Sequence, residues 1–239
     1  MTIAVEKTVR EMALEIPDAT RVFEKLGIDY CCGGGKSLEE ACSAAKLPIA
    51  QVLDALAKAG QPAVEPQHDW SSELLADLVE HIVHTHHKYT REEIGRLQAL
   101  LVKVCSVHGK NHPELATIQG TFRGLSQELT MHMMKEEMVL FPYIVRMEEA
   151  VLEKEPVLPP PFGSVQNPVH MMMGEHDSAG EALRAMREAS RGYAVPDDGC
   201  VSYRTLYQAL EAFEADLHQH IHLENNVLFP RAVAMEESH

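Results

Sequence analysis

The sequence predicts an all-α protein in which a small helical domain precedes a four-helix bundle. Apolar residues recur at steps of three and four along most of the chain after residue 71, as on one face of a helix. No segment alternates polar and apolar residues as a half-buried strand does. The stretch HMMKEEMVLFP at residues 132–142 returns 88 residues later as HIHLENNVLFP at residues 220–230. Paired helices of a bundle account for such a repeat.

Composition and charge exclude several classes of protein. A chain of 239 residues can form one medium and one small domain. The net charge is −15 with only 21 basic residues, which argues against a nucleic-acid partner. No apolar run is long enough for a membrane span and no secretory signal is visible, so we expect no membrane association and a cytoplasmic protein. Five cysteines, an odd number, indicate free or redox-active thiols rather than a disulfide framework.

Residues 1–60 have the pattern of a small helical domain. Helices are expected over Thr8–Ile16, over Ala19–Leu26 and after Ser37, where Ser37 and Glu40 make a capping box. The sequence DYCCGGG between the last two fits no regular element. Residues 61–70 contain prolines and no periodicity, so we expect a linker there.

Residues 71–239 should form the bundle. Asp69 or Ser71 can cap a first helix that ends near His108-Gly109. A second helix is expected from Pro113 to Met147, with a bend at Pro142. A proline-rich connection at 153–168 precedes a third helix that begins at Asn167-Pro168 and runs to Arg191. The fourth is expected from Cys200 to Val233.

The repeated stretch places metal-binding side chains on helix faces. Positions four apart share a face, so His132 and Glu136 point the same way, as do His220 and Glu224. On the first helix the apolar steps leave one gap, which falls on His87, with His86 beside it as the alternative. On the third helix the stripe Val169, Met173, His176, Leu183 and Met186 selects His176 over His170. The spacings match, with 45 residues from His87 to His132 and 44 from His176 to His220.

Four imidazoles and two carboxylates in one core predict a site for two cations bridged by the glutamates. Iron fits best, manganese is the alternative, and zinc fits less well because six ligands leave open positions. A core without metal would have to bury these polar groups at a cost of several kcal/mol each unless they are paired. Because binding needs neutral imidazoles, we expect the metal affinity to weaken as pH falls through about 6.5.

The segments HMMKEE, GEHDSAG and LENNVLFPRA, behind a domain with YCCGGG, resemble the Repair of Iron Centres family over nearly the whole chain. The resemblance implies a hemerythrin-like bundle with two non-haem iron ions bridged by oxo and carboxylate groups. It implies a cytoplasmic stress protein that restores iron-sulfur clusters damaged by nitric oxide or peroxide. The implied ligands are His87, His132, Glu136, His176, His220 and Glu224. Glu128 and Glu175 match acidic positions near the irons; for Glu128 the alternative is an ordinary solvated side chain.

The sequence departs from that of oxygen-carrying hemerythrins, which resemble this bundle. Gly180 stands where they have a further histidine, and Asn225 where they have an aspartate. The connection between the second and third helices is also longer than the family needs. Fewer imidazoles leave more open coordination, which favours exchange of small ligands or loss of ferrous iron over storage of oxygen.

The cysteines and methionines admit two interpretations each. Cys31-Cys32 is followed by three glycines, so we expect the two thiols to be accessible. The pair is expected to act as a redox or iron relay, and the alternative is a loop whose thiols have no role. A disulfide between the two neighbours would be strained. Cys42, Cys105 and Cys200 are expected to pack between helices. The methionine runs at 133–134 and 171–173 are expected in the core rather than in a soft-metal site.

The resemblance, together with the predicted site, leads to two main hypotheses for the function. The first is a repair factor that supplies or exchanges iron, with damaged iron-sulfur proteins as partners, rather than a turnover enzyme. The alternative is a protein that binds or reduces nitric oxide, with nitric oxide or oxygen as small ligands. A redox sensor is a third and weaker hypothesis, because no output domain is visible. The sequence leaves the oligomeric state open, with a homodimer among the assemblies to test.

Overall fold

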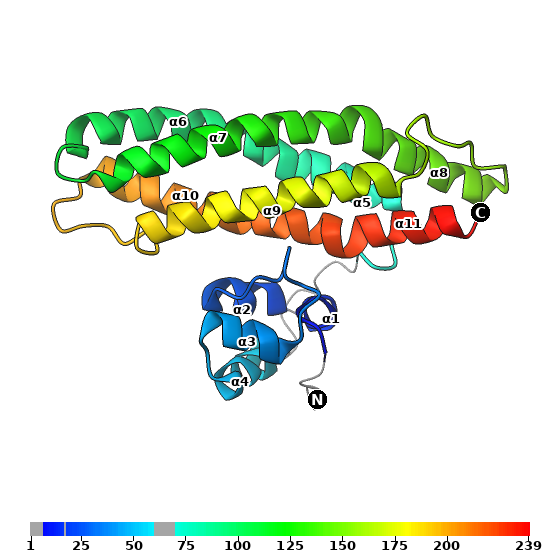
Figure 1. Cartoon of the computed structure of the whole chain (residues 1–239), viewed down its shortest axis with the longest axis horizontal. Coiled ribbons are helices and arrows are strands. Elements are labelled where there is room, and N and C mark those ends of the chain that lie inside the picture. The colour runs from blue at the N-terminus through cyan, green and yellow to red at the C-terminus, as the bar shows by residue number, and fades with distance from the viewer. Residues whose placement is uncertain (1–6, 17, 60–69) are drawn as a thin grey trace.

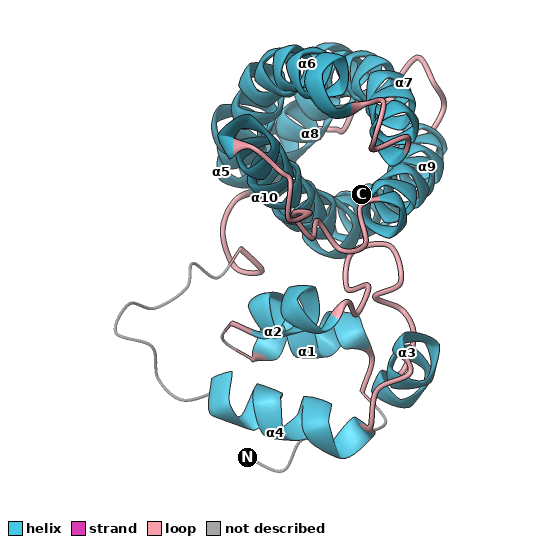
Figure 2. Cartoon of the chain, turned by 90° about the vertical axis from the view of Figure 1, so that its left-hand side faces the viewer, coloured by secondary structure: helices cyan, strands magenta, loops and turns pink. Residues whose placement is uncertain are grey.

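The computed structural model describes residues 7–16, 18–59 and 70–239. Within these ranges the chain is helical and has no strand, only one isolated bridge between Thr8 and Ser37. A small domain of short helices packs beneath a long four-helix bundle (Figure 1), whose helices form a ring when viewed end-on (Figure 2). The predicted all-α class and domain order are confirmed. No described helix is long and apolar enough to span a membrane.

The small domain contains α1 (Val9–Glu15), α2 (Ala19–Leu26), α3 (Leu38–Ala45) and α4 (Ile49–Ala59). The capping box of Ser37 and Glu40 is confirmed, and Thr8 with Glu11 forms a second one. The sequence analysis expected one helix after Ser37, but there are two, because Lys46 turns the backbone into a left-handed conformation with a φ of 56° before Pro48. The predicted linker at 61–70 lies outside the described residues apart from Trp70.

The bundle consists of four antiparallel helices, three of which contain a π-helical segment. The first comprises α5 (Leu75–His81), η1 (Ile82–His87) and α6 (Lys88–His108); the second comprises α7 (Glu114–Lys135), η2 (Glu136–Leu140) and α8 (Phe141–Glu153). The third is α9 (Gln166–Ala189), and the fourth comprises α10 (Val201–Leu223), η3 (Glu224–Leu228) and α11 (Phe229–Glu237). Each helix ends within a few residues of its predicted boundary, except that the second continues past Met147 to Glu153.

The repeated prolines explain two of the π-helical segments. Pro142 and Pro230 lie in the first turns of α8 and α11, directly after η2 and η3. A proline lacks the amide hydrogen of an α-helix and crowds the carbonyl one turn before it. The wider π turn accommodates that defect within a continuous helix. Near the predicted bend at Pro142, the helix changes its pitch locally over Glu136–Leu140.

Two glutamates, the buried Glu148 and the half-buried Glu236, cap helices of the bundle from a neighbouring helix. Glu148 accepts the N–H groups of Leu75 at 2.7 Å and Ala76 at 2.8 Å, and so caps α5. Glu236 accepts the N–H of Val165 at 2.9 Å, at the start of α9. The two glutamates are 88 residues apart, as are His132 and His220, so the repeat extends beyond the quoted segments.

The predicted starts of the first and third helices need correction, because Glu148 and Glu236 cap these helices. The first helix begins at Leu75, after Ser71, and Asp69 lies outside the described residues. The third begins at Gln166, so that Asn167 lies inside its first turn and donates to the carbonyl of Phe162 at 2.8 Å. A carboxylate supplied from a distant helix replaces a local cap in both cases.

Two apolar clusters fill the bundle, one on each side of a polar layer. The cluster near the α6–α7 connection includes Leu101, Phe122, Leu183 and Phe213. The other includes Leu75, Ile144, Met172 and Phe229. On every helix the predicted ligand lies between residues of the two clusters. The apolar packing therefore holds the polar layer from both sides.

Some of the expected packing residues are placed differently. Met133 and Met172 are buried, whereas Met134, Met171 and Met173 are 42%, 51% and 39% exposed. The core prediction thus holds only for one methionine of each run, because successive helix positions point about 100° apart. Cys42 and Cys105 pack against the cores, but Cys200 is exposed at the start of α10, and its predicted packing role is wrong.

Candidate metal centre

Six buried side chains meet in the polar layer of the bundle. They form two groups in which the ligand atoms lie within 4.8 Å of one another: His87, Glu136, His220 and Glu224, and His132, Glu136, His176 and Glu224. None of the six is more than 3% exposed. The structure thus brings together all six residues that the sequence analysis selected as ligands.

Each glutamate contributes one oxygen to each group. Glu136 Oε1 lies 3.3 Å from His132 Nε2, and its Oε2 lies 3.4 Å from His87 Nε2. Glu224 Oε1 lies 2.9 Å from His220 Nε2, and its Oε2 lies 3.0 Å from His176 Nε2. The two carboxylates therefore span the space between the groups as bridging ligands do.

The donor set fits metal ions. Both oxygens of Glu136 and Oε2 of Glu224 are buried and have no hydrogen-bond partner within the part of the chain that the structure describes. The Nε2 atoms of His87 and His220 face each other at 3.2 Å, and those of His132 and His176 at 3.0 Å. Facing lone pairs repel unless a cation or a proton lies between them. Separations near 3 Å are also those of adjacent ligands on one ion when each bond is about 2.0–2.2 Å long.

A second layer of side chains orients three of the four imidazoles. The Nδ1 atom of His87 lies 2.7 Å from Glu137 Oε1, and that of His132 lies 2.8 Å from Glu175 Oε2. The Nδ1 atom of His176 lies 2.8 Å from the side-chain oxygen Oδ1 of Asn225. An acceptor at Nδ1 keeps the proton there and leaves Nε2 free to bind metal.

Glu175 was predicted from the sequence, whereas Glu137 was not. Glu137 directly follows the ligand Glu136, just as Asn225 follows Glu224, and this equivalence is the signal that could have revealed it. Arg91 pairs with Glu137 and Lys135 pairs with Glu175. These ion pairs, together with the histidines, hold the pKa of both carboxyl groups below the usual value although burial opposes it.

Glu128 does not join the site. It is exposed and belongs to neither group of ligand atoms. Each step of four residues rotates the side-chain direction by about 40° beyond a full turn. Glu128 lies two such steps before Glu136, so the two side chains point about 80° apart. The expected iron-facing position is therefore wrong, and the ordinary solvated alternative describes this side chain.

His86, the alternative to His87, lies beside the site and outside both groups. Its ring stacks on His220 with 5.7 Å between centroids, and its Nδ1 lies 3.0 Å from Asp216 Oδ1. His220 Nδ1 is buried and has no hydrogen-bond partner among the described residues. His86 thus packs on one predicted ligand, His220, and directly precedes another, His87. Glu175 has the equivalent position, because it contacts His132 and directly precedes His176.

The repeated phenylalanine completes the packing around the ligands. Phe141 stacks on His87 at 5.7 Å between centroids, and Phe229 stacks on His176 at 6.0 Å. Each copy of Val-Leu-Phe-Pro therefore supplies a ring that holds an imidazole of another helix. The repeat encodes ligands, their packing and the π-helical turn in one segment.

Charges inside the layer shift the pKa of its histidines. Burial lowers the pKa of His132, but the carboxylates of Glu136 and Glu224 outweigh it and raise the pKa to about 9. The same carboxylates raise the pKa of His87 against burial. Without metal, the layer holds protons that a binding cation must displace. Protons then compete for His132 well above pH 6.5, whereas burial lowers the pKa of His220.

The small domain contacts the bundle next to this layer. The amide of Asn226 donates to the carbonyl of Tyr30 at 3.1 Å, and Arg10 Nε donates to Asn226 Oδ1 at 2.9 Å. A Cβ atom at Gly34 would lie 2.8 Å from the Tyr30 carbonyl and 3.2 Å from Asn226 Oδ1. The glycine therefore permits the close approach of the YCCGGG loop to η3.

The cysteine pair in this loop is less open than expected. Cys31 is 4% exposed, and Cys32 is half-buried. Both thiols are free, with their sulfur atoms 3.8 Å apart. Contact with Cys32 and burial raise the pKa of Cys31, and the charge of Asp29 adds to the effect. The pair lines a cavity of about 330 Å³ between the small domain and the bundle.

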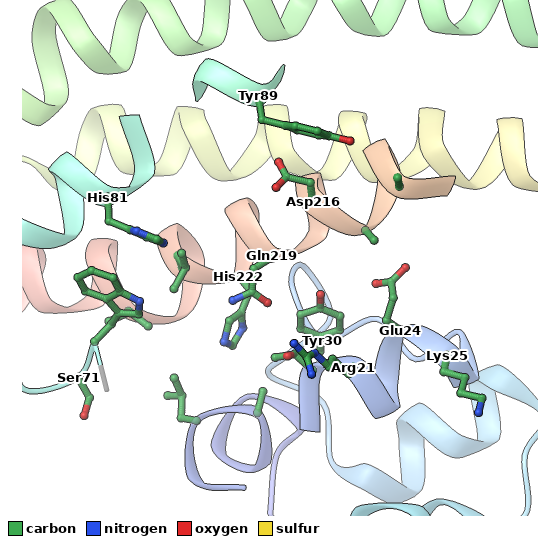
Figure 3. A pocket seen from close by; sticks show the side chains of 18 residues that line it. Arg21, Glu24, Lys25, Tyr30, Ser71, His81, Tyr89, Asp216, Gln219 and His222 are labelled. Carbon is green, nitrogen blue, oxygen red and sulfur yellow. The ribbon is translucent and has the colours of Figure 1, made fainter. Parts of the chain in front are cut away.

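A larger cleft of about 1210 Å³ lies between the small domain and the first and fourth helices. Figure 3 shows Tyr30 and Glu24 on the side of the small domain, opposite Asp216 and His81 from the bundle. Asp216 is the partner of His86, which stacks on His220. The cleft thus comes within two side chains of the polar layer.

Comparison with known proteins agrees with both parts of the chain. The model of the hemerythrin HHE cation binding domain matches residues 78–232, and that of a domain of unknown function, DUF542, matches residues 5–60. The chain is 34% identical over 232 residues to the iron-sulfur cluster repair protein YtfE of Escherichia coli O17:K52:H18, and the match covers 97% of this chain and 98% of that protein. The protein of the same name in Escherichia fergusonii is equally similar, with 34% identity over the same shares of both chains.

Proposed function

Because this chain belongs to the family of hemerythrin-like iron-sulfur cluster repair proteins, we propose that it repairs iron-sulfur clusters damaged by nitrosative or oxidative stress. In this proposal a di-iron centre supplies iron to the damaged cluster or exchanges iron with it. The names of the relatives favour repair over the alternative of nitric oxide reduction.

One observation carries the di-iron assignment. Two groups of donor atoms share both glutamates, and each group adds two imidazoles of its own. Two ions side by side, bridged by Glu136 and Glu224, use every donor once and bring the three unpaired oxygens into contact with a cation. A single ion would leave one pair of facing imidazoles without a partner.

The arrangement favours release of iron over permanent retention. Iron bound here can accept small ligands such as nitric oxide or oxygen, because four protein donors leave open positions on an ion that takes six. Glu137, Glu175 and Asn225 keep the Nε2 atoms aimed inward while a cation leaves or enters. Glu136 and Glu224 each reach both groups of donor atoms, so movement of either side chain would affect both metal positions.

We further propose that Cys31-Cys32 is a relay element between the bundle and a client. The loop is joined to the metal layer, since the Asn225 amide that contacts His176 also lies 3.5 Å from the Cys31 carbonyl. Cys32 faces the cavity of about 330 Å³ together with acidic side chains from both domains, among them Asp29 and Glu181. Five carboxylates line this cavity against two arginines, Arg184 and Arg187, so its net charge favours cations.

The proposed partners are damaged iron-sulfur proteins. All five cysteines are free, which suits a reducing compartment, and we place the protein in the cytoplasm for that reason.

Transfer of labelled iron tests the proposal. The protein is loaded with ⁵⁷Fe without oxygen and mixed with a cluster protein whose iron-sulfur centre has been damaged by nitric oxide. We expect ⁵⁷Fe to appear in the restored cluster, and about two irons per chain in the donor at the start. The double variant Glu136→Ala/Glu224→Ala should neither hold nor transfer iron.

Glu128→Ala is the matched control, because this glutamate lies on the same helix but outside the site. Transfer by the control without transfer by the double variant supports the proposal. Two irons in the parent with no transfer under reducing conditions would refute iron donation and keep the metal centre. Iron retained by the double variant would refute the ligand assignment.

A further inference from the structure

A second cluster of metal-binding side chains lies at the far end of the bundle, where α6 is joined to α7 and α9 to α10 (Figure 1). His108 is the last residue of α6, His112 lies in the turn before α7, and Asp198 lies in the connection before α10. One ligand atom from each lies within 4.8 Å of the other two. None of these residues takes part in the di-iron layer.

His112 is held in the orientation of a metal ligand. Its Nδ1 lies 2.9 Å from Glu114 Oε1, and its Nε2 lies 2.9 Å from Asp198 Oδ1. A carboxylate on one ring nitrogen of a histidine, with the other nitrogen directed at a ligand position, is the usual support of a zinc-binding imidazole. Glu114 has this supporting position, and Asp198 provides a second ligand beside Nε2.

His108 has a buried nitrogen without a partner. Its Nε2 makes no hydrogen bond to any described residue, although buried polar atoms are nearly always paired. The rings of His108 and His112 both pack edge-on against Tyr203, at 5.3 and 5.4 Å between centroids. The tyrosine therefore fixes both imidazoles, and a cation beside them would satisfy His108.

Cys200 lies two residues after Asp198, but its thiol is not among the ligand atoms of the cluster that lie within 4.8 Å of one another. Cys200 is exposed, and it is joined to Asp198 through Gly199. A Cβ atom at Gly199 would lie 2.7 Å from Val195 Cγ1 and 2.9 Å from the Pro196 carbonyl, so the tight turn requires glycine. The thiol of Cys200 lies beside the Tyr203 N–H and the His108 side chain, at the edge of the cluster.

We propose that His108, His112, Asp198 and Cys200 bind one Zn²⁺ ion that joins the two end loops of the bundle. Two imidazoles, one carboxylate and one thiolate match the ligand types and number of a tetrahedral zinc site. The H-x₃-H spacing of the histidines is also that of many zinc sites. This site is independent of the di-iron layer and of the proposed repair activity.

Cobalt provides the test, because Co²⁺ replaces Zn²⁺ and a bound thiolate gives it an intense charge-transfer absorption. Co²⁺ is titrated into the iron-loaded protein, and iron is measured before and after. We expect one equivalent of Co²⁺ to bind without loss of iron and the thiolate absorption to appear. Cys200→Ser should abolish that absorption, and Glu114→Gln should weaken binding about 10–100-fold.

Two controls make the result specific. The double variant Cys31→Ser/Cys32→Ser tests the other thiols, and His170→Gln alters an exposed histidine outside the cluster. Both should bind Co²⁺ like the parent. In addition, Zn²⁺ should raise the melting temperature of the parent and not that of His112→Gln.

Either of two results would overturn the proposal. One is the absence of a further equivalent of bound Co²⁺ in the iron-loaded protein. The other is a thiolate absorption that survives in Cys200→Ser and disappears in the Cys31/Cys32 variant. If Cys200→Ser itself melts early, the His112→Gln and Glu114→Gln variants decide the question from affinity alone.

Discussion

Replacing Glu148 with alanine tests whether a carboxylate from one helix stabilises the start of another. Glu148 is 4% exposed, and its two oxygens accept the N–H groups of Leu75 at 2.7 Å and Ala76 at 2.8 Å. A hydrogen bond to an ionised group contributes about 1.5–3 kcal/mol, so the loss of two should cost about 3–6 kcal/mol. For a chain of this size each kcal/mol lowers the melting temperature by about 2–4 °C. We therefore expect a decrease of about 6–24 °C.

Thermal unfolding followed by circular dichroism, on protein with equal iron content, measures the effect. Glu149→Ala is the matched control, because Glu149 is the next residue and is exposed; its effect should stay within about 0.5 kcal/mol. Glu148→Gln keeps the side-chain volume but turns an amide N–H toward one of the backbone donors, so it should also destabilise. Equal melting of Glu148→Ala and Glu149→Ala would refute the capping argument. A stable Glu148→Gln would show that volume alone matters.

Three further predictions concern the site and the thiols. Glu137→Ala removes the acceptor at His87 Nδ1 and should lower iron affinity about 10–100-fold in competition with a chelator, and unchanged affinity would exclude an orienting role. Cys31→Ser/Cys32→Ser should keep two irons per chain but slow ⁵⁷Fe transfer, and full transfer would refute the relay. The Tyr203 N–H and the His108 side chain lower the pKa of Cys200 to about 7. Because the thiolate is the reactive form, the rate of Cys200 alkylation should rise with pH and reach half its maximum near pH 7. A midpoint near pH 8.5 would contradict this prediction.

The ligand layer was predictable because two periodicities coincide in it. His132 and Glu136 share a helix face through local geometry, and their repetition at His220 and Glu224 indicates a symmetric partner. His87 followed from a gap in the apolar steps of its helix, and His176 from its place in the stripe of the third helix. These inferences use only the pitch of one helix and a comparison of two segments.

The side chains that support the ligands were harder to predict, because they act between helices. Glu137 and Glu175 contact imidazoles of other helices, 50 and 43 residues away in the chain. Glu128 shares a helix with a ligand and satisfied the local argument, yet it faces solvent. Residues four apart differ in side-chain direction by about 40°. Sequence spacing alone therefore cannot separate a residue that contacts a ligand from one that faces solvent.

The sequence alone determined the helical class, the two domains, the repeat and the six residues of the polar layer, because these depend on periodicity and residue type. Tertiary structure decided which oxygen of Glu136 and Glu224 meets which histidine, which carboxylates cap α5 and α9, and that Cys31 is buried while Cys200 is exposed. The end loops that bring His108, His112 and Asp198 together also belong to this second class. Such contacts depend on the packing of segments far apart in the chain, and no local pattern records that packing.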